Sequence, residues 1–314
     1  MKIIVTGATG MIGVAIVCEA LSKGYEVCAI VRKNSSRMGN LSELTAKNVN
    51  IQVIECDIQD YNNLVFDSKY NAFIHTAWQG TDLNLRDNIY EQIDNITYTI
   101  DAVHAAKRAG CEVFISIGSQ AECGRVQEKI RGDSACNPDS AYGIAKYAAG
   151  KAANLVAAQI GLRCCHARIL SVYGKGMNDN TLIVYLVKKI LAGDKPSLTR
   201  CEQLWDYIYD RDAARALLAI VEKGINGKTY PIGSGSAKPL NEFVKTIRNM
   251  IDSDVELGFG EKEYYPYQPL YLCADLDELY QDTGFKPIVS FEDGIRETIA
   301  WVKACVTRDS VTVS

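Results

Sequence analysis

The sequence predicts an α/β fold in which a doubly wound parallel sheet carries a second, smaller lobe. In the first half of the chain, short β-branched and apolar runs alternate with longer segments of helical spacing. This order is typical of parallel strands joined by right-handed crossover helices. The first apolar run leads directly into three closely spaced glycines and then a helical segment. With 314 residues, 47% hydrophobic and 23% charged, the chain has the composition of an ordinary globular protein with a large core.

The elements of this half follow in order along the chain. We expect strands at 2–6, 26–31, 51–55, 72–76, 112–117 and 163–170, and helices at 11–23, 85–109 and 139–160. The longest of these helices is indicated by Ile89, Ile93, Ile96 and Ile100, which recur at intervals of three and four residues.

After Tyr173-Gly174 the pattern changes. Residues 180–200 read as a helix followed by a loop, 206–223 are expected to return to the main sheet, and 236–290 form a mixed stretch rich in tyrosine. We therefore predict a sheet domain from 1–173 and about 203–235, and a smaller mixed α/β lobe from about 174–202 and 236–314.

Composition and charge exclude several classes of protein. The formal net charge is −4 without a block of like charges, so nucleic acid is not an expected partner. No apolar run approaches the ~20 residues of a membrane span, and glycines interrupt the apolar residues 3–18 where a secretory signal would be uniform. Eleven scattered cysteines without a CxxC pair predict free, buried thiols in a reducing cytoplasm, with neither disulfides nor a metal site.

A glycine-rich turn joins the first strand to the first helix in Thr6-Gly-Ala-Thr-Gly-Met-Ile-Gly13. Gly7 permits the tight turn, Gly10 lets a pyrophosphate approach the backbone, and Gly13 lets the helix pack closely on the strand. The free amides and the dipole at the start of the helix favour an anion. The GxxGxxG spacing is one residue longer at the front than GxGxxG, and we interpret this Rossmann-type turn as a candidate dinucleotide-binding site.

A second motif is Tyr142-Gly-Ile-Ala-Lys146, in which the tyrosine and the lysine share one face of a helix. An ammonium beside a phenol lowers the pKa of the phenol, so that the tyrosine can exchange a proton with a carbonyl or hydroxyl oxygen. Tyr147 and Lys151 form a second such pair, roughly 140° further around the helix. We choose Tyr142 because Pro138 and Ser140 place it in the first turns, and we interpret Tyr147 and Lys151 as packing and surface residues.

A third motif, Phe114-Ile-Ser-Ile-Gly-Ser119, is an apolar strand that ends in small polar residues. It places the Ser119 hydroxyl at the carboxyl edge of the sheet, where ligands of such folds bind. There the hydroxyl could hydrogen-bond a substrate carbonyl oxygen beside Tyr142. Taken alone, the serine would more simply end a strand.

Together these motifs resemble the extended short-chain dehydrogenase/reductase family, which comprises NAD(P)-dependent nucleotide-sugar epimerases, dehydratases and reductases. The resemblance covers nearly the full length of the chain. It depends on Thr6–Gly13, Cys56-Asp57-Ile58, Ile74-His-Thr-Ala77, Asn95…Thr99, Ser119, Tyr142…Lys146, Tyr173-Gly174, Asp206-Tyr-Ile-Tyr-Asp-Arg-Asp212 and Gly284-Phe-Lys-Pro287.

The resemblance implies that Ser119, Tyr142 and Lys146 are catalytic. It places Asp57 and Ile58 beside the adenine, and Lys146 also on the nicotinamide ribose. Asn95 either supports the active site through its helix or is a simple polar helix contact. The full set of expected cofactor contacts from these motifs is Gly7, Thr9, Gly10, Met11, Ile12, Gly13, Asp57, Ile58, Ala77 and Lys146. The expected substrate contacts are Trp78, Gln120, Ser171, Thr181 and Trp205.

The loop after the second strand indicates which cofactor is bound. NAD-preferring members of the family end that strand with an acidic residue that binds the ribose hydroxyls. Here the strand runs into Arg32-Lys33-Asn34-Ser35-Ser36-Arg37, which has no carboxylate. Guanidinium groups pair well with phosphate, so we expect Arg32, Ser36 and Arg37 to bind a 2′-phosphate. NADP(H) is favoured, and NAD(H) remains possible.

Departures from the family pattern reduce the number of activities that the sequence supports. Sugar 4,6-dehydratases carry an Asp-Glu pair directly after the catalytic hydroxyl, whereas this chain has Gln120-Ala121, so dehydration is not expected. Trp205 stands where an arginine usually holds the diphosphate, Ser171 replaces a common asparagine, and the stretch from Tyr264 to Tyr271 lacks the usual arginine. The sequence gives no interpretation of Cys123, which replaces a tyrosine.

We therefore expect a cytoplasmic NADP(H)-dependent oxidoreductase that reduces a nucleotide-linked 4-keto-6-deoxy sugar. The first alternative is a nucleotide-sugar 4-epimerase with tightly bound NAD. Reduction of a non-nucleotide carbonyl, as in plant-type flavonoid reductases, and a non-catalytic NAD(P)-sensing protein also remain open. Residues 85–109 and 139–160 each have an apolar face, and similar helices pair in dimers of the family, so a homodimer is expected.

Overall fold

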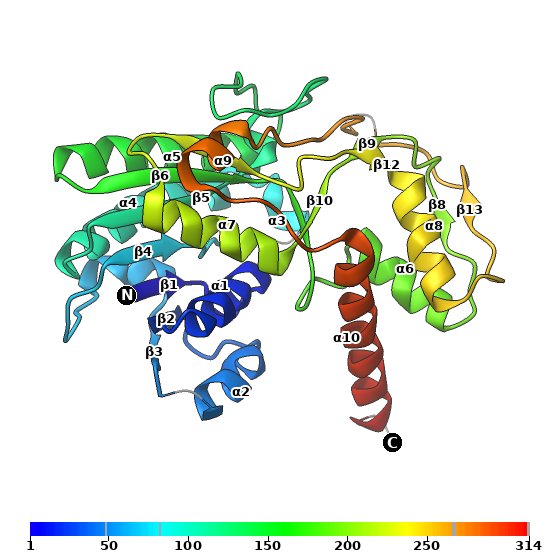
Figure 1. The fold of residues 1–314 in the computed structure, drawn as a ribbon, viewed down its shortest axis with the longest axis horizontal. Helices are drawn as coiled ribbons and strands as arrows, with labels where there is room; N and C mark the ends of the chain where they lie inside the picture. Colours follow the sequence, from blue (N-terminus) through cyan, green and yellow to red (C-terminus); the bar gives the residue numbers. More distant parts are fainter. Residues whose placement is uncertain (48, 82, 266–267, 313–314) are drawn as a thin grey trace.

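The central feature of the computed structural model is a seven-stranded parallel sheet, and the model describes residues 1–47, 49–81, 83–265 and 268–312 (Figure 1). The strand order is β11-β6-β5-β4-β1-β2-β3, which confirms the doubly wound class. The strands are β1 (Lys2–Thr6), β2 (Glu26–Val31), β3 (Ile51–Glu55), β4 (Ala72–His75), β5 (Val113–Ser119), β6 (Arg163–Ile169) and β11 (Thr229–Ile232). The first six lie within two residues of the predicted ranges.

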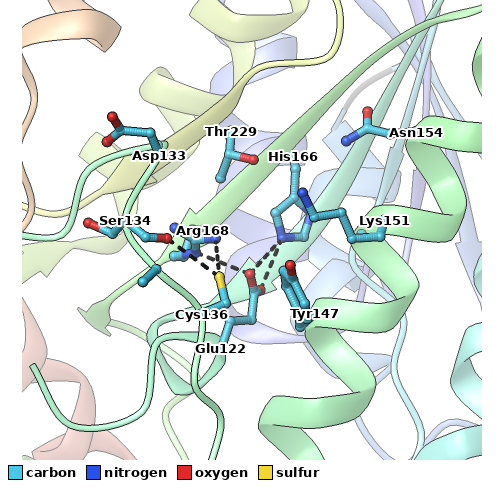
Figure 2. Close-up of a pocket in the computed structure, with 13 residues that line it drawn as sticks. Glu122, Asp133, Ser134, Cys136, Tyr147, Lys151, Asn154, His166, Arg168 and Thr229 are labelled. Carbon is cyan, nitrogen blue, oxygen red and sulfur yellow. Dashed lines mark hydrogen bonds and ion pairs between the residues drawn. The ribbon is translucent and has the colours of Figure 1, made fainter.

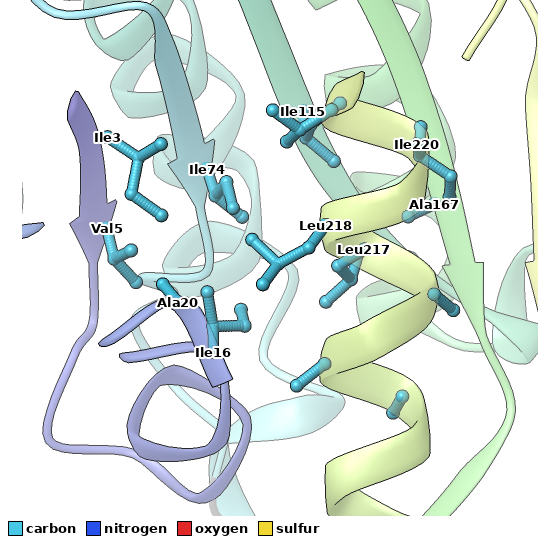
Figure 3. Close-up of a cluster of buried hydrophobic side chains, with 14 of the residues drawn as sticks. Ile3, Val5, Ile16, Ala20, Ile74, Ile115, Ala167, Leu217, Leu218 and Ile220 are labelled. Carbon is cyan, nitrogen blue, oxygen red and sulfur yellow. The ribbon is translucent and has the colours of Figure 1, made fainter. Parts of the chain in front are cut away.

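Helices cover both faces of the sheet (Figure 1). On one face lie α1 (Met11–Ser22) and α7 (Asp210–Lys223), and on the other lie α4 (Ile89–Arg108) and α5 (Ala141–Gln159). Alternate residues of a strand point to opposite faces, so Ile3 and Val5 join the core under α1 and α7 while Ile4 joins the core under α4. Figure 3 shows the first of these cores, in which Ile16 meets Leu218. Burying each such side chain contributes roughly 1.5–3 kcal/mol.

The second lobe is built around three helices, α6 (Leu182–Leu191), α8 (Leu240–Ile251) and α10 (Phe291–Thr312), which pack on one another (Figure 1). Short strand pairs complete it: β7 (Ser171–Tyr173) with β10 (Tyr207–Tyr209), β8 (Ser197–Leu198) with β13 (Gly258–Phe259), and β9 (Leu204–Trp205) with β12 (Lys238–Pro239). Tyr173, Phe243 and Phe291 meet in its aromatic core.

The second half of the chain differs from the prediction in two respects. Residues 206–223 return as β10 and α7, but β10 pairs with β7 outside the main sheet, and the strand that extends the sheet is β11. In addition, α9 (Asp277–Thr283) packs on α7 and β11, and its Leu279 belongs to the core of the sheet. The division into two domains therefore stays a prediction.

The predicted helix 85–109 is two helices, α3 (Leu83–Arg86) and α4. The break lies at Asn88, whose side chain accepts a hydrogen bond from the Tyr90 amide and so caps α4. Arg86 therefore ends the short helix α3 and is not part of the long helix α4.

Two further predictions concern the thiols and the membrane. Eight of the eleven cysteines are buried, as expected, and these eight are free thiols. Within the described ranges, no helix is both long enough and apolar enough to cross a membrane.

Candidate active site

The glycine turn between β1 and α1 has the backbone that only glycine tolerates well. Gly7 has a φ of +62°, and a Cβ there would lie 2.7 Å from the Thr76 hydroxyl oxygen. A Cβ on Gly13 would collide with the Gly7 carbonyl oxygen. Gly10 is the N-cap of α1 and supplies no side-chain cap, and the first helical turn holds no acidic residue. The turn therefore presents free amides and no negative charge, which fits a phosphate.

Other predicted cofactor residues lie at the neighbouring strand ends. Thr9 is buried, and its hydroxyl oxygen lies 3.2 Å from that of Ser35. Asp57 follows β3 and accepts a hydrogen bond of 3.1 Å from the Lys33 amide. The Ala77 amide donates to the Thr6 hydroxyl after β4. The remaining ones are Met11 and Ile12 in the first turn of α1, and Ile58 at the start of the 3-10 helix η1 (Ile58–Asn63).

The loop after β2 carries the predicted phosphate-binding side chains. Arg32, Ser36 and Arg37 are all exposed there, whereas the neighbouring Ser35 is buried against Thr9. The Arg37 guanidinium donates a hydrogen bond of 2.6 Å to the Asn178 side-chain oxygen, in the loop before α6. The exposed charge and the glycine turn together fit a dinucleotide.

Ser119, Tyr142 and Lys146 come together where β5 ends and α5 begins. Ser119 ends β5 and caps the 3-10 helix η2 (Gln120–Glu122), with its hydroxyl accepting from the Ala121 amide. Ser140 caps α5 by accepting from the Gly143 amide, which sets Tyr142 in the first turn of the helix. The Ser119 side chain acts on Tyr142 as a neighbour that lowers the pKa of the phenol. The Lys146 ammonium lies 5.7 Å from the centroid of the Tyr142 ring.

The pKa of Tyr142 in the structure differs from the prediction. Burial raises the pKa of Tyr142 above its ordinary value, and the charge of Arg86 and hydrogen bonding from Ser119 oppose this. Burial lowers the pKa of Lys146 to about 7, although the charge of Glu122 acts in the other direction. The Lys146 ammonium donates to the Ile117 carbonyl oxygen at 2.9 Å. Burial thus outweighs the groups that lower the pKa of Tyr142, and the lowered tyrosine pKa that the motif predicts is not found in this structure.

Two side chains from the segment between β4 and α4 cover this pair. The Trp78 ring has the Lys146 ammonium 3.6 Å from its centroid and meets the Tyr142 ring edge to face at 6.0 Å. Arg86 lies over the Tyr142 ring, with its guanidinium carbon 4.1 Å from the centroid. Trp78 was an expected substrate contact, whereas Arg86 was not expected at the site because it was assigned to a continuous helix.

A buried ionic cluster lies beneath Ser119, and sequence reasoning missed it. Glu122 accepts hydrogen bonds from the Ser119 amide at 2.7 Å and the Arg168 guanidinium at 3.1 Å, and lies 3.0 Å from the His166 ring nitrogen. Burial alone would raise the pKa of Glu122, but His166, Arg168 and the Ser119 amide together hold it at about 2. One signal in the sequence could have predicted this cluster: His166 and Arg168 are two residues apart on β6, so their side chains lie on the same face of the sheet.

A cavity of about 240 Å³ opens beside this cluster (Figure 2). Tyr147 and Lys151 line it, together with Asn154, His166 and Cys136. The lysine is exposed at the rim and its ammonium lies 5.5 Å from the centroid of the Tyr147 ring. The second Tyr-x-x-x-Lys pair thus faces a different space from Tyr142, in keeping with its place on the helix.

The other expected substrate residues lie on separate elements of the fold. Gln120 directly follows Ser119, and Ser171 begins β7. Thr181 is the N-cap of α6, and its hydroxyl donates to the Asn178 carbonyl oxygen. Trp205 is half-buried and packs against two apolar clusters. Cys123 is buried in the smaller of these clusters, which gives it a packing role.

Asn95 lies in α4 and is fully buried. Its side-chain oxygen accepts from the Gln79 amide at 2.8 Å, and its amide nitrogen donates back to the Gln79 carbonyl oxygen at 3.1 Å. Asn95 thus fixes the residue next to Trp78, so it supports the site through its helix.

Comparisons with known proteins find relatives over nearly the whole chain. The family model described as the NAD dependent epimerase/dehydratase family matches residues 3–233. A dTDP-glucose 4,6-dehydratase of Escherichia coli is 26% identical, with 96% of this chain and 93% of that protein covered. A dTDP-4-dehydro-6-deoxyglucose reductase of Escherichia coli is 22% identical, with 96% and 97% covered. The solved UDP-glucuronic acid 4-epimerase from Bacillus cereus in complex with NAD shares the fold, with a TM-score of 0.84, 22% identity and 98% of each chain covered.

Proposed function

The chain belongs to the NAD dependent epimerase/dehydratase family, and from this premise we propose that it is an NADP(H)-dependent reductase of a nucleotide-linked 4-keto-6-deoxy sugar. Members of the family modify nucleotide sugars by several reactions, so the activity depends on the residues around the reacting carbon. The proposal is supported by the likeness to the dTDP-4-dehydro-6-deoxyglucose reductase over nearly the whole of both chains.

The observation that carries the proposal is the pair Gln120-Ala121 directly after Ser119. Elimination of water from a sugar needs an acid and a base at the reacting carbons, and neither an amide nor a methyl group can supply one. The nearest carboxylate in sequence, Glu122, is turned into the buried cluster with His166 and Arg168 and is not exposed. Ketone reduction needs only a hydride donor, one proton donor and groups that orient the oxygen.

The chain itself supplies the proton donor and the groups that orient the oxygen. A nicotinamide cofactor, when bound, would supply the hydride for the new C–H bond at the carbonyl carbon. Tyr142 donates the proton that forms the new O–H bond, and solvent then reprotonates the tyrosine. The Ser119 hydroxyl hydrogen-bonds the same oxygen and orients it. Lys146, which is buried beside them with a pKa of about 7, binds the nicotinamide ribose.

We further propose NADP(H) as the cofactor, because the loop after β2 exposes Arg32 and Arg37 and has no carboxylate between residues 32 and 37. A guanidinium group can pair with a 2′-phosphate through two parallel hydrogen bonds. Arg37 already donates to Asn178, so Arg32 is the guanidinium with the greater freedom to meet a phosphate.

The first experiment identifies the nucleotide that leaves the purified protein on denaturation and then measures NADPH oxidation with dTDP-4-keto-6-deoxyglucose. Sugars linked to UDP, CDP and GDP provide the matched series. We expect exchangeable NADPH, net oxidation with at least one of these sugars, and turnover lowered by about 10²-fold or more in Tyr142→Phe. Binding of NADPH without oxidation in the presence of any of them would contradict the reductase assignment.

A nucleotide-sugar 4-epimerase is the second candidate, and it would use the same Ser119 and Tyr142. It is favoured by the shared fold of the Bacillus cereus 4-epimerase, which was solved with NAD. Tightly retained NAD, together with interconversion of 4-epimers and no net oxidation of cofactor, would move this candidate to first place. The same outcome would overturn the interpretation of Arg32.

We also propose that the protein is a cytoplasmic homodimer that pairs through α4 and α5. Both helices expose large apolar side chains, with Tyr90 82% and Ile93 47% exposed on α4, and Ile144 46% and Leu155 63% exposed on α5. A dimer would cover them. Sedimentation of the wild type and of Leu155→Glu tests this, and a wild-type monomer at all concentrations would refute it.

A further inference from the structure

The loop before α5 carries a thiol that the proposed reaction does not use, that of Cys136. Its side chain lines the cavity of about 240 Å³, and its sulfur accepts a hydrogen bond of 3.1 Å from the Arg168 guanidinium (Figure 2). The contact that uses the thiol proton, to the Ser134 carbonyl oxygen, is long at 3.7 Å. A thiolate would keep the short contact and give up only the long one.

Arg168 is a permanent cation beside this sulfur. The guanidinium is buried, and its Nε donates to Glu122 while its Nη2 is directed at Cys136. A guanidinium group stays charged at every pH at which the protein is folded. Cysteines are reactive where such a cation lies beside the sulfur and solvent reaches it. Cys136 meets both conditions, because it is half-buried and lines a cavity whose rim carries the exposed Lys151.

A second cysteine lies close to Cys136. Cys123 directly follows η2 and is buried in the small apolar cluster against which Cys136 packs. The two chain segments meet one residue further on, because a Cβ on Gly124 would collide with the Asn137 carbonyl oxygen. Burial and the neighbouring Cys136 raise the pKa of the Cys123 thiol to about 12, although the charge of Arg168 acts in the other direction. Cys123 therefore stays protonated, and Cys136 is the thiol of the pair that reacts first.

We propose that Cys136 is a site of reversible oxidation by hydroperoxides, and that Cys123 resolves the oxidised form as a disulfide. In the first step the Cys136 thiolate attacks the hydroperoxide, and an S–O bond forms as the O–O bond breaks. The sulfur loses two electrons and becomes a sulfenic acid, while the leaving oxygen takes a proton and departs as an alcohol or water. In the second step the Cys123 sulfur forms the S–S bond, the S–O bond breaks, and the Cys123 proton leaves with the hydroxide as water. A dithiol reductant returns two electrons and two protons and restores both thiols.

The oxidation state of Cys136 reaches the active site through buried hydrogen bonds. Arg168 donates to Glu122 at 3.1 Å, and Glu122 accepts from the Ser119 amide at 2.7 Å. A sulfur bonded to Cys123 carries no charge, so the disulfide deprives Arg168 of an anionic partner. The disulfide also ties the end of η2, which Ser119 caps, to the loop before α5. Oxidation therefore changes the support of the Ser119 hydroxyl.

The test uses the full chain and needs no substrate. The reduced protein is treated with hydrogen peroxide, the remaining thiols are blocked with iodoacetamide, and its peptides are mapped by mass spectrometry without reduction. In Cys123→Ser the reaction should stop at the sulfenic acid, which dimedone traps. Cys18 is the matched comparison, because it is exposed on α1 but partial burial and the charge of Asp210 raise the pKa of its thiol.

We expect peroxide to link Cys123 to Cys136 in about half of the wild-type molecules or more, and dithiothreitol to remove the link. In Cys123→Ser, dimedone should modify Cys136 about fivefold or more faster than Cys18. Absence of the linked peptide from the wild type would overturn the inference. Oxidation of Cys18 ahead of Cys136, or a disulfide between Cys136 and a different cysteine, would do the same.

The peptide map separates this inference from the proposed function, because neither step of the oxidation uses a sugar or a nicotinamide. If the linked peptide forms and no keto sugar is reduced, the proposed substrate is wrong and the oxidation site stands. With a sugar that is turned over, oxidised wild type freed of peroxide should be slower by about threefold or more and should recover with dithiothreitol. An equal loss in Cys136→Ser would refute the link from Cys136 to Ser119.

Discussion

Replacing Glu122 by glutamine should destabilise the protein strongly near neutral pH, because it removes the one carboxylate in a buried cluster. Glu122 is fully buried between His166 and Arg168, and its pKa is about 2 in place of an ordinary 4.5. Each pKa unit corresponds to about 1.4 kcal/mol, so ionised Glu122 contributes about 3 kcal/mol of stability. Glutamine has nearly the same shape but leaves the Arg168 charge unpaired, and breaking a buried pair typically costs about 3–5 kcal/mol.

The sign of the pH dependence follows from the lowered pKa. The stabilisation by Glu122 is fully present above pH 4.5, where the carboxylate is ionised in both states, and is lost as the pH falls towards 2. The unfolded chain takes up this proton before the folded chain does. In Glu122→Gln this contribution is missing, so the difference from wild type should be largest near pH 7 and should shrink in acid.

The assay is urea unfolding at pH 7 and at a series of lower pH values, followed by both circular dichroism and tryptophan fluorescence. Glu256→Gln is the matched control, since the Glu256 side chain is 82% exposed and should change stability by less than about 0.5 kcal/mol. Equal stabilities of wild type and Glu122→Gln at pH 7 would refute the reasoning. So would a difference that stays constant as the pH falls.

Four further predictions test the site and its surroundings. Tyr142→Phe should lower turnover by about 10²-fold or more while NADPH affinity stays unchanged, and retained turnover would exclude Tyr142 as the proton donor. Arg32→Asp should shift the ratio of NADPH to NADH dissociation constants by about tenfold or more towards NADH, and an unchanged ratio would exclude Arg32 from the phosphate site. Gly13→Ala should cost about 1–3 kcal/mol and weaken dinucleotide binding in titrations, because its Cβ meets the Gly7 carbonyl, whereas Gly39→Ala meets nothing within 4 Å and should be tolerated. Burial raises the pKa of Asp210 to about 6 from 3.8, so the protein loses stability as the pH rises through 6 and the folded chain must ionise this carboxyl. Asp210→Asn should therefore raise the free energy of unfolding, measured in urea, by up to about 3 kcal/mol at pH 7.5 and by little at pH 4.

The features that could be predicted from the sequence are those imposed by the local backbone. The strand ends are marked by β-branched runs that stop at small or polar residues, and the turn at Gly7 needs a positive φ that glycine supplies. Ser140 caps α5 through its own side chain, so Tyr142 falls in the first turn as the sequence indicates. Each of these depends on residues within a few positions of one another.

The charges around Tyr142 could not be predicted in the same way, because they depend on contacts between distant residues. Arg86 and Tyr142 are far apart in the chain, and their contact depends on the break at Asn88. It also depends on Gln92 of α4, whose side chain is hydrogen-bonded to Trp78, Gly80 and Leu85. The helical spacing of isoleucines in α4 hides that break. A periodicity argument extends a helix until a strong breaker appears, and Asn88 is a weak one outside its capping role.

The spacing of Tyr142 and Lys146 shows that a motif predicts where two side chains lie more reliably than it predicts how they act on each other. Four residues on a helix bring the two side chains to one face, and the structure has them there. Whether the ammonium acts on the phenol depends on its other partners, and here the Ile117 carbonyl oxygen and the Trp78 ring hold it. Ile117 is two residues before Ser119 on β5, so the strand end that presents the hydroxyl also holds the lysine. Arg86 lies on the Tyr142 ring as well, so the cations near this phenol come from two elements, and only the one on its own helix could be predicted from the spacing.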